Sequence, residues 1–267
     1  MAKTNIKKND HLATNSAIEL VQWPVLNVLA FQTTCHHPNE KKLTKLNNKL
    51  KLPYKCFNLG LHVEDDPLTV KSNRDYIEDK MLDGKKIQWL NQLHGSNVVF
   101  INQVSSSVLE ADACITANKS IALAIMTADC LPILISDKKG RKIAAIHGGW
   151  RPLAANIIAK TIKKMDVDVN ELAIWLGPCI GQSSFEVGAE VYNIFIAQGE
   201  KFSQAFHKST QGKYLANLYV IARIQLESIG VSCIHSLEEC TYTLADKYYS
   251  YRRNQVTGRM ASIICQL

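Results

Sequence analysis

The sequence lacks the features that assign many chains to a common class at first inspection. No apolar run approaches the roughly 18 residues of a membrane-spanning helix. The basic N-terminus "MAKTNIKKNDHLATNSAIEL" has no apolar stretch typical of a signal peptide. No GxGxxG or Walker-type loop is present, so the sequence supports neither a dinucleotide site nor a P-loop. We therefore expect a cytoplasmic protein without a membrane partner.

Cysteine and histidine are present, but not in the patterns of disulfide scaffolds or zinc fingers. None of the eight cysteines forms a CxxC pair, and a chain of 267 residues can bury a core without the help of disulfide bonds. We expect free thiols, as in a reducing compartment. Only two of the eight histidines, His36 and His37, are adjacent, and no HxH motif occurs.

The charge is moderately basic, with 31 Lys and Arg against 24 Asp and Glu and a net charge of +7. The densest basic run covers 39–55 and lacks the aromatic residues of a base-stacking surface. We interpret it as a solvated face or loop and expect no nucleic-acid partner. A basic surface would also suit an anionic substrate.

Short apolar runs and helical patterns are mixed along the chain without strict βαβ alternation. Helical spacing follows Pro152 and recurs over 187–199 and 214–230, each ending at a glycine. This mixture predicts an α/β (α+β) sandwich, a mixed sheet core flanked by helices, in a single domain over 21–267 after a loosely ordered segment, 1–20. The expected strands are 25–31, 86–92, 97–102, 121–127, 131–136, 142–147 and the final "RMASIICQL".

A polar turn, "DKKGR", joins two of these apolar runs and predicts a β-hairpin. If the loop is 137–140, Ser136 lies opposite Arg141, and counting outward places Cys130 opposite His147. Directly opposed residues have Cβ atoms about 4.5–5.5 Å apart, which suits a shared metal ion or a thiol–imidazole pair. A register slip of one residue would separate the two side chains onto opposite faces.

His94 is a third candidate, because it follows the strand "KIQWL" and precedes a glycine. One cysteine and two histidines suit Zn²⁺ and leave a fourth position open for water or substrate. An open zinc site is typical of catalysis. The spacing alone also permits the alternative that Cys130 is core and His147 a hydrogen-bonded polar residue.

Glycine-containing loops supply the other candidate residues. In "HGGWRP", Gly148 and Gly149 precede a helix start beside Arg151, an arrangement that favours anion binding but also occurs in ordinary strand-to-helix turns. The remaining candidates lie in or near "LGPCIG" and "NLGLHVEDDP": Cys179, Glu186, Asn58 and His62.

These segments together resemble one family, the bacterial laccase-domain proteins. That family was long labelled multicopper polyphenol oxidase and later recognised as zinc-dependent purine nucleoside enzymes. The similarity runs in order from about Val25 to the C-terminus. The segments that carry it are "FNLGLHVEDDP", "NQLHGSNV", "ADACIT", "TADCLPILI", "IHGGWR", "LGPCIG" with "FEVGAEV", and "SYRRNQVTGRMASII".

The resemblance implies that His94, Cys130 and His147 bind zinc. It also implies phosphorolysis of adenosine, inosine, guanosine or 5′-methylthioadenosine to free base and ribose 1-phosphate, with adenosine deamination in some members. The partners would be a purine nucleoside and phosphate. Copper fits less well, because multicopper oxidases need many histidines, commonly in close pairs, and this chain has eight.

Phosphorolysis requires phosphate held beside the sugar C1′ and stabilisation of the departing purine. The residues that we expect to be catalytic are Asn58, His62 and Arg151. The residues that we expect to bind substrate or phosphate are Arg74, Gly148, Gly149, Arg151, Cys179 and Glu186.

One departure from the family pattern bears on activity. The family has an arginine in a "TTR-x-GG" segment, whereas this chain reads "TTCHHPNEKK", with Cys35 at that position. Either another cation replaces the charge or the activity differs. The family's glycine after the Trp-Arg pair is replaced by Pro152, which is compatible with a helix start.

Three other functions remain open at this point. A metal-free cysteine hydrolase would use Cys130 as nucleophile and His147 as base. A non-catalytic zinc protein would need a fourth ligand, for which Cys179 is a candidate. A copper-dependent polyphenol oxidase is the last. The sequence ranks neither the nucleosides nor the oligomeric states.

Overall fold

The computed structural model describes residues 16–38, 53–210 and 212–267. The predicted loose segment covers residues 1–20, of which 1–15 lie outside the described residues. Strand β1 (Ile18–Leu20) lies inside this segment and pairs with β2. The segment was therefore predicted too long at its C-terminal end. The basic run 39–55 is described only from residue 53, so its interpretation stays a prediction.

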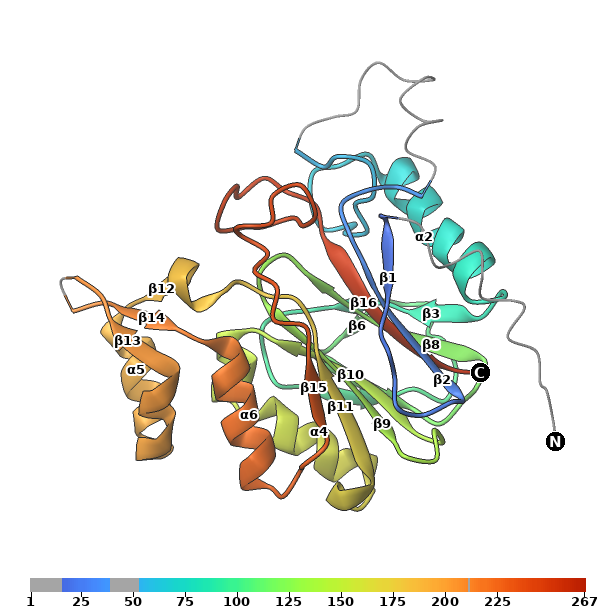
Figure 1. Ribbon diagram of the computed structural model, residues 1–267. Coiled ribbons are helices and arrows are strands. Elements are labelled where there is room, and N and C mark those ends of the chain that lie inside the picture. Colours follow the sequence, from blue (N-terminus) through green and yellow to red (C-terminus); the bar gives the residue numbers. More distant parts are fainter. Residues whose placement is uncertain (1–15, 39–52, 211) are drawn as a thin grey trace.

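Two mixed β-sheets lie face to face and form the centre of the molecule (Figure 1). The first sheet has the order β1-β2-β16-β8-β3, with β2 (Val28–Thr33), β16 (Met260–Gln266), β8 (Ile121–Thr127) and β3 (Lys86–Gln88). The second has the order β15-β11-β9-β10-β7-β5, with β15 (Ile234–Ser236), β11 (Leu172–Leu176), β9 (Leu131–Asp137), β10 (Ile143–Gly148), β7 (Ala113–Thr116) and β5 (Val98–Phe100).

Helices cover the outer faces of both sheets, and Figure 1 shows them on opposite sides of the molecule. Helix α2 (Pro67–Met81) packs on the first sheet, where Ile77 is buried beside Phe31. The second sheet is covered by α3 (Trp150–Ala154), α4 (Ile157–Met165) and α6 (Leu218–Ser228), while α5 (Ala189–Ile196) packs on the small elements between residues 200 and 216. This single-domain arrangement of mixed sheets flanked by helices confirms the predicted fold class.

Smaller elements complete the chain. They are β4 (Leu90–Asn91), β6 (Leu109–Glu110), η1 (Val169–Glu171), η2 (Gln182–Ser184), β12 (Glu186–Val187), η3 (Glu200–Ala205), β13 (Phe206–Lys208) and β14 (Tyr214–Ala216). Strands β12, β14 and β13 form a separate small sheet. No helix in the described ranges combines the length and apolar character that crossing a membrane would require.

Apolar side chains on both faces of the strands explain why the two sheets stack and why helices cover them. Leu123 and Ile125 of β8 face the second sheet, while Ala122 and Ala124 face α2 on the other side. Because both faces are covered, the strand is a continuous apolar run rather than an alternating one. The predicted strand 121–127 coincides with β8 and the predicted final strand with β16, so both are confirmed.

The helical predictions needed correction. The helix expected from Pro152 begins at Trp150 and is interrupted by Asn156, whose φ of 57° is left-handed and separates α3 from α4. The pattern over 214–230 contains a strand, β14, before α6. Helix α2 was missed, although Asp66 caps its N-terminus through Thr69 and Pro67 occupies the first turn.

The hairpin of β9 and β10 forms, but with a longer turn than predicted. Ser136 lies opposite Ile143 rather than Arg141. The carboxylate of Asp137 accepts the backbone N–H groups of Arg141 and Lys142, which closes the wider turn. The pairing is therefore shifted by two residues, and a shift of two keeps every side chain on its predicted face.

Two glycines with positive φ give a matched test of this turn. Gly140 has φ 61°, and a Cβ there would lie 2.7 Å from Cγ of Asn27, whereas Gly84 has φ 79° and open space. We expect Gly84→Ala to lower the free energy of unfolding by about 1 kcal/mol through backbone strain alone. Gly140→Ala should cost about 2–4 kcal/mol, because the collision adds to the strain. Urea unfolding measures both, and equal losses would contradict the collision.

Candidate metal centre and adjoining pocket

The three predicted ligand residues converge at one end of the second sheet. His94 follows β4, Cys130 immediately precedes β9, and His147 lies on β10. Their potential ligand atoms all lie within 4.8 Å of one another. The Sγ of Cys130 is 3.8 Å from Nε2 of His94, and the two imidazole rings meet edge to face at 4.6 Å. Among the described residues this is the one cluster of its kind.

The observed register explains how Cys130 reaches His147. Continued past β9, the pairing places Cys130 opposite Gly149 and diagonal to His147, not directly opposite it. A Cβ at Gly149 would lie 3.1 Å from the Cys130 sulfur, so a larger residue there would crowd the thiol. Glycine therefore lets the two backbones approach at the site.

One carboxylate orients both histidines. Asp112 lies just before β7 and accepts the Nδ1–H of His147 at 2.7 Å, so that Nε2 is the ring nitrogen left for Cys130 or a metal. It also accepts the backbone N–H groups of His94 at 2.9 Å and Gly95 at 2.6 Å. These bonds hold His94 in a left-handed conformation with φ 57°. Carboxylates that orient ligand histidines in this way are typical of metal sites.

The ionisation of Cys130 also suits a cation, whereas His147 must release a proton before it binds one. Burial alone would raise the pKa of the Cys130 thiol, but the charge of His147 and hydrogen bonds from both histidines lower it to about 6. Burial would lower the pKa of His147, but Cys130 and Asp112 outweigh burial and raise it to about 9. The site thus favours a thiolate, the form in which cysteine binds metals.

The residue before Cys130 connects the cluster to the C-terminal segment. Asp129 has φ 102°, an uncommon conformation for a residue with a side chain. Its carboxylate accepts the hydroxyl of Thr241 and the backbone N–H of Arg252, both at 2.7 Å. Two residues that lie more than 100 positions further along the chain therefore fix the backbone next to the Cys130 thiol.

A cavity of about 500 Å³ opens beside the cluster and includes all three candidate ligands in its lining. Three arginines give it a basic character: Arg151, Arg252 and Arg259. The apolar part of its lining comes from Met126, Trp150, Ile180, Phe185, Leu218 and Tyr251. Each of the three arginines lies over an aromatic ring of this lining. Basic and apolar groups in one cavity suit a ligand with one anionic and one flat apolar part.

Of the residues predicted to be catalytic, His62 and Arg151 line this cavity. Burial, reinforced by the charges of Arg259 and Arg74, lowers the pKa of His62 to about 4. His62 is therefore neutral at pH 7 and can donate one hydrogen bond and accept another. The guanidinium of Arg151 lies over the Trp150 ring at 4.5 Å.

Asn58 and Arg74 are near the cavity but do not line it. The Asn58 side chain is buried and accepts the backbone N–H of Arg259 at 2.8 Å, so it positions that segment. Arg74 donates twice to the carbonyl of Leu59 and stacks on Trp89 at 4.0 Å. Both side chains therefore lie behind the residues that line the cavity.

Cys179 and Glu186 also lie outside the cavity lining. Cys179 is fully buried and is not part of the ligand cluster, so the structure does not support it as a fourth metal ligand. The Glu186 carboxylate pairs with Lys213 at 2.8 Å and accepts the hydroxyl of Ser209. Their predicted substrate-binding role stays a prediction.

The Gly-Gly pair has a packing role, and its anion-binding role stays a prediction. A Cβ at Gly148 would lie 2.7 Å from the carbonyl oxygen of Leu131, across the hairpin. Gly149 caps α3, a helix of only five residues, which aligns few peptide dipoles. The structure therefore gives little support to an anion site on these backbone N–H groups.

A cation does lie beside the residue that departs from the family pattern. Lys55 places its Nζ 3.1 Å from the sulfur of Cys35 and donates to the carbonyl of Ala245. This finding agrees with the first of the two alternatives, in which another cation replaces the family's arginine.

Sequence reasoning missed Asp112, Asp129, Tyr251, Arg252 and Arg259 as site residues. All five lie within segments that carried the family resemblance, namely "ADACIT", "TADCLPILI" and "SYRRNQVTGRMASII". Their roles depend on contacts with residues distant in the chain, so local spacing did not reveal them.

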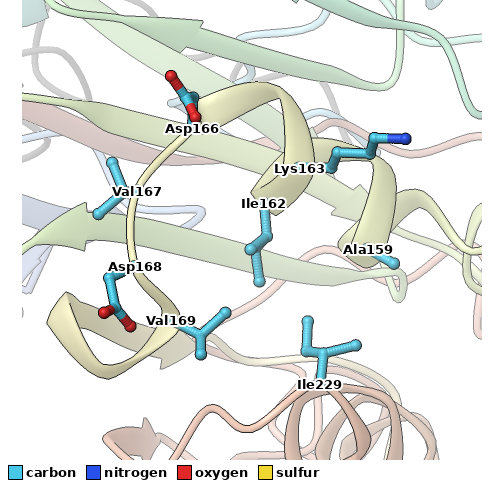
Figure 2. Close-up of a pocket in the computed structure, with 8 residues that line it drawn as sticks. All are labelled: Ala159, Ile162, Lys163, Asp166, Val167, Asp168, Val169 and Ile229. Carbon is cyan, nitrogen blue, oxygen red and sulfur yellow. The ribbon is translucent and has the colours of Figure 1, made fainter.

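A second cavity, of about 470 Å³, lies between α4, η1 and the end of α6. Figure 2 shows Ile162, Val169 and Ile229 pointing toward one another there. None of the predicted site residues lines it. The chemistry is therefore expected at the cavity beside His94, Cys130 and His147.

Fold and site together define a single-domain protein of two mixed sheets with a His-Cys-His metal-site candidate beside a basic cavity. A family model described as "Multi-copper polyphenol oxidoreductase laccase" matches residues 43–266, and the chain belongs to this family. This membership confirms the resemblance found in the sequence.

Relatives and a solved structure agree with this assignment. The chain is 41% identical to "Purine nucleoside phosphorylase PA4543" of Pseudomonas aeruginosa, over 83% of this chain and 90% of that protein. It is 40% identical to "Purine nucleoside phosphorylase YfiH" of Escherichia coli, over 79% and 87%. The crystal structure of Neisseria meningitidis protein NMB0706 superposes with a TM-score of 0.86 at 35% identity, covering 94% of this chain and 99% of that one.

The role of Asp112 can be tested by metal affinity. We expect Asp112→Asn to weaken zinc binding by about 10–100-fold, because the neutral amide no longer fixes and polarises His147. Competition with a chromogenic chelator measures the dissociation constant. Asp137→Asn is the matched control, since Asp137 is a buried carboxylate at the far end of the same hairpin. Equal affinity of the Asp112 variant and the wild type would contradict the assignment.

Proposed function

We propose that this protein is a zinc-dependent purine nucleoside phosphorylase. It would convert adenosine, inosine, guanosine or 5′-methylthioadenosine, with phosphate, into the free base and ribose 1-phosphate or its methylthio analogue. One observation carries the proposal: a three-ligand metal-site candidate opens into a cavity of about 500 Å³ with three arginines in its lining. The relatives named as purine nucleoside phosphorylases support the same activity.

The donor set fits zinc. Zn–S and Zn–N bonds of about 2.3 and 2.0–2.1 Å in tetrahedral geometry place sulfur and nitrogen about 3.6 Å apart. The Sγ of Cys130 and Nε2 of His94 are 3.8 Å apart. Three protein ligands would leave a fourth coordination position open, as in catalytic zinc sites. Bound zinc would supply a Lewis acid there.

The arginines of the cavity suit phosphate. Arg259 lies near both His62 and Cys130, since its charge lowers the pKa of His62 and the charge of Cys130 acts on the pKa of Arg259. We assign the phosphate position to Arg259 and Arg252, with Arg151 also in the lining. A phosphate oxygen held there would attack the ribose C1′ as the bond from C1′ to the purine nitrogen breaks. The arginines would hold the charge without transferring a proton.

The apolar lining suits the purine and the ribose. Phe185 and Tyr251 offer aromatic rings for the base, and Ile180 belongs to the same apolar wall. Neutral His62 would bind a ribose hydroxyl. Water exclusion by this wall would favour phosphate over water as the nucleophile.

Two competing activities define the controls. A metal-free cysteine hydrolase remains possible because Cys130 lies beside two imidazoles. Adenosine deamination would use the same cavity without phosphate. The family's oxidase label is less favoured, because the described residues offer one three-ligand cluster and multicopper chemistry needs several.

The primary experiment joins metal analysis to one assay. We expect the wild type to hold zinc near one equivalent and to release adenine from adenosine only with phosphate. Cys130→Ala should lose both properties, because the thiolate ligand is removed. Cys233→Ala is the matched control, a partly exposed cysteine outside the ligand cluster.

Each competing activity gives a distinct result in this assay. Inosine formed without phosphate would assign deamination. Activity that survives chelators but not alkylation would assign the cysteine hydrolase. A wild type without zinc that leaves every nucleoside intact would refute the proposal.

Arg259 gives a second test. We expect Arg259→Gln to raise KM for phosphate by about 10–100-fold, because one charge-assisted hydrogen bond is worth about 1.5–3 kcal/mol. The KM for nucleoside should change much less. Arg141→Gln is the control, since this arginine pairs with Asp137 at the hairpin turn. Steady-state kinetics with each substrate varied separately make the comparison, and parallel increases in both KM values would argue against a phosphate role.

A further inference from the structure

Outside the ligand cluster, two cysteines from distant segments lie side by side. Cys179 follows β11, and Cys240 lies in the segment between β15 and β16. The backbone of Cys179 bonds on both sides of Cys240, accepting from Thr241 and donating to Glu239. The two residues form an isolated parallel bridge.

This pairing satisfies the main requirement of a disulfide. Adjacent strands lie about 4.8 Å apart, and disulfides join Cα atoms that are about 4.4–6.8 Å apart. Both sulfurs also contact the same peptide group. Cys179 Sγ donates to the Ile180 carbonyl at 3.6 Å, and Cys240 Sγ accepts the Gly181 N–H at 3.1 Å. A side-chain rotation of Cys179 would therefore turn its sulfur toward Cys240 without a change in chain pairing.

The two thiols have different environments. Cys240 is partly exposed, whereas Cys179 is fully buried. Burial alone would raise the pKa of Cys240, but hydrogen bonds from Thr243 and the Gly181 N–H lower it overall. Burial raises the pKa of Cys179. Cys240 is thus the accessible and nucleophilic member, and Cys179 is the protected one.

The pair lies at the junction of two segments that support the active cavity. Ile180 lines the cavity and donates its backbone N–H to the carbonyl of Asp129. Thr241, next to Cys240, bonds the carboxylate of the same Asp129. A covalent link between Cys179 and Cys240 would therefore join the two segments that hold the residue preceding Cys130.

We propose that Cys179 and Cys240 are a redox-active pair that a hydroperoxide converts reversibly into a disulfide. The Cys240 thiolate attacks the peroxide, so that an S–O bond forms, the O–O bond breaks and hydroxide or alkoxide leaves with a proton from solvent. The Cys179 thiol then attacks the sulfenic sulfur, forming the S–S bond and releasing water. Two electrons pass from the two thiols to the peroxide.

The test uses the full-length, zinc-loaded protein and hydrogen peroxide. We expect intact mass spectrometry to show the loss of two hydrogen atoms, restored by dithiothreitol. Peptide mapping should place the crosslink between Cys179 and Cys240, with bound zinc unchanged. Cys240→Ser should abolish the crosslink, and Cys233→Ser, at another partly exposed cysteine, should retain it.

A trapping experiment identifies the attacked sulfur. In Cys179→Ser, dimedone should label Cys240 and no disulfide should form. Should that buried variant fail to fold, brief peroxide treatment of the wild type with dimedone present should label Cys240 ahead of the other cysteines. Oxidation first at Cys130 with zinc release, or labelling at Cys233 without the crosslink, would overturn the proposal. These readouts do not depend on nucleoside turnover, so they stand apart from the proposed function.

Discussion

The hydrogen bonds of one buried carboxylate, Asp112, hold the candidate metal centre together. Asp112 binds His147 through two hydrogen bonds. Its carboxylate accepts from the imidazole ring, and its backbone carbonyl accepts the backbone N–H of His147 at 2.7 Å. The same carboxylate fixes the backbone of His94. Since both histidines depend on one group, their spacing relative to Cys130 is set before any metal binds. Pre-organisation of this kind lowers the conformational cost of binding.

The second constraint is the closure of the site by the C-terminal segment. Asp129 holds that segment through Thr241 and Arg252, at the expense of an uncommon backbone conformation. Strained residues of this kind cluster at functional sites, where the surrounding structure enforces them. Arg252 and Arg259 enter the cavity through this closure. The thiolate and Arg252 are therefore coupled through a single side chain, whereas Asn58 holds the backbone of Arg259.

The cavity and the paired cysteines are connected through neighbouring residues in the chain. Ile180 belongs to the cavity wall, and its neighbour Cys179 pairs with Cys240. The family's oxidase label describes chemistry that requires several metal ions, whereas the described residues form one three-ligand cluster. Nucleoside chemistry at that cluster and redox chemistry at the cysteine pair would use different sulfurs. The structure keeps those sulfurs on separate loops.

Local sequence patterns determined much of the fold and part of the site. Buried strands such as β8 and β16 are continuous apolar runs, so their positions could be read directly. The hairpin brought Cys130 and His147 to one face although its register was wrong by two residues, because side-chain direction in a strand repeats every two residues. Helix α2 was missed despite a readable cap at Asp66 and Pro67.

Only the tertiary structure decided the residues that support the site. Asp112 is 35 residues from His147, and Asp129 is 112 residues from Thr241. Contacts over such distances depend on sheet order and strand pairing, which local periodicity does not encode. The structure also removed Cys179 and Glu186 from the cavity and placed Arg252 and Arg259 in it. The sequence thus determined which residues could bind a metal, and the packing of two sheets decided what surrounds them.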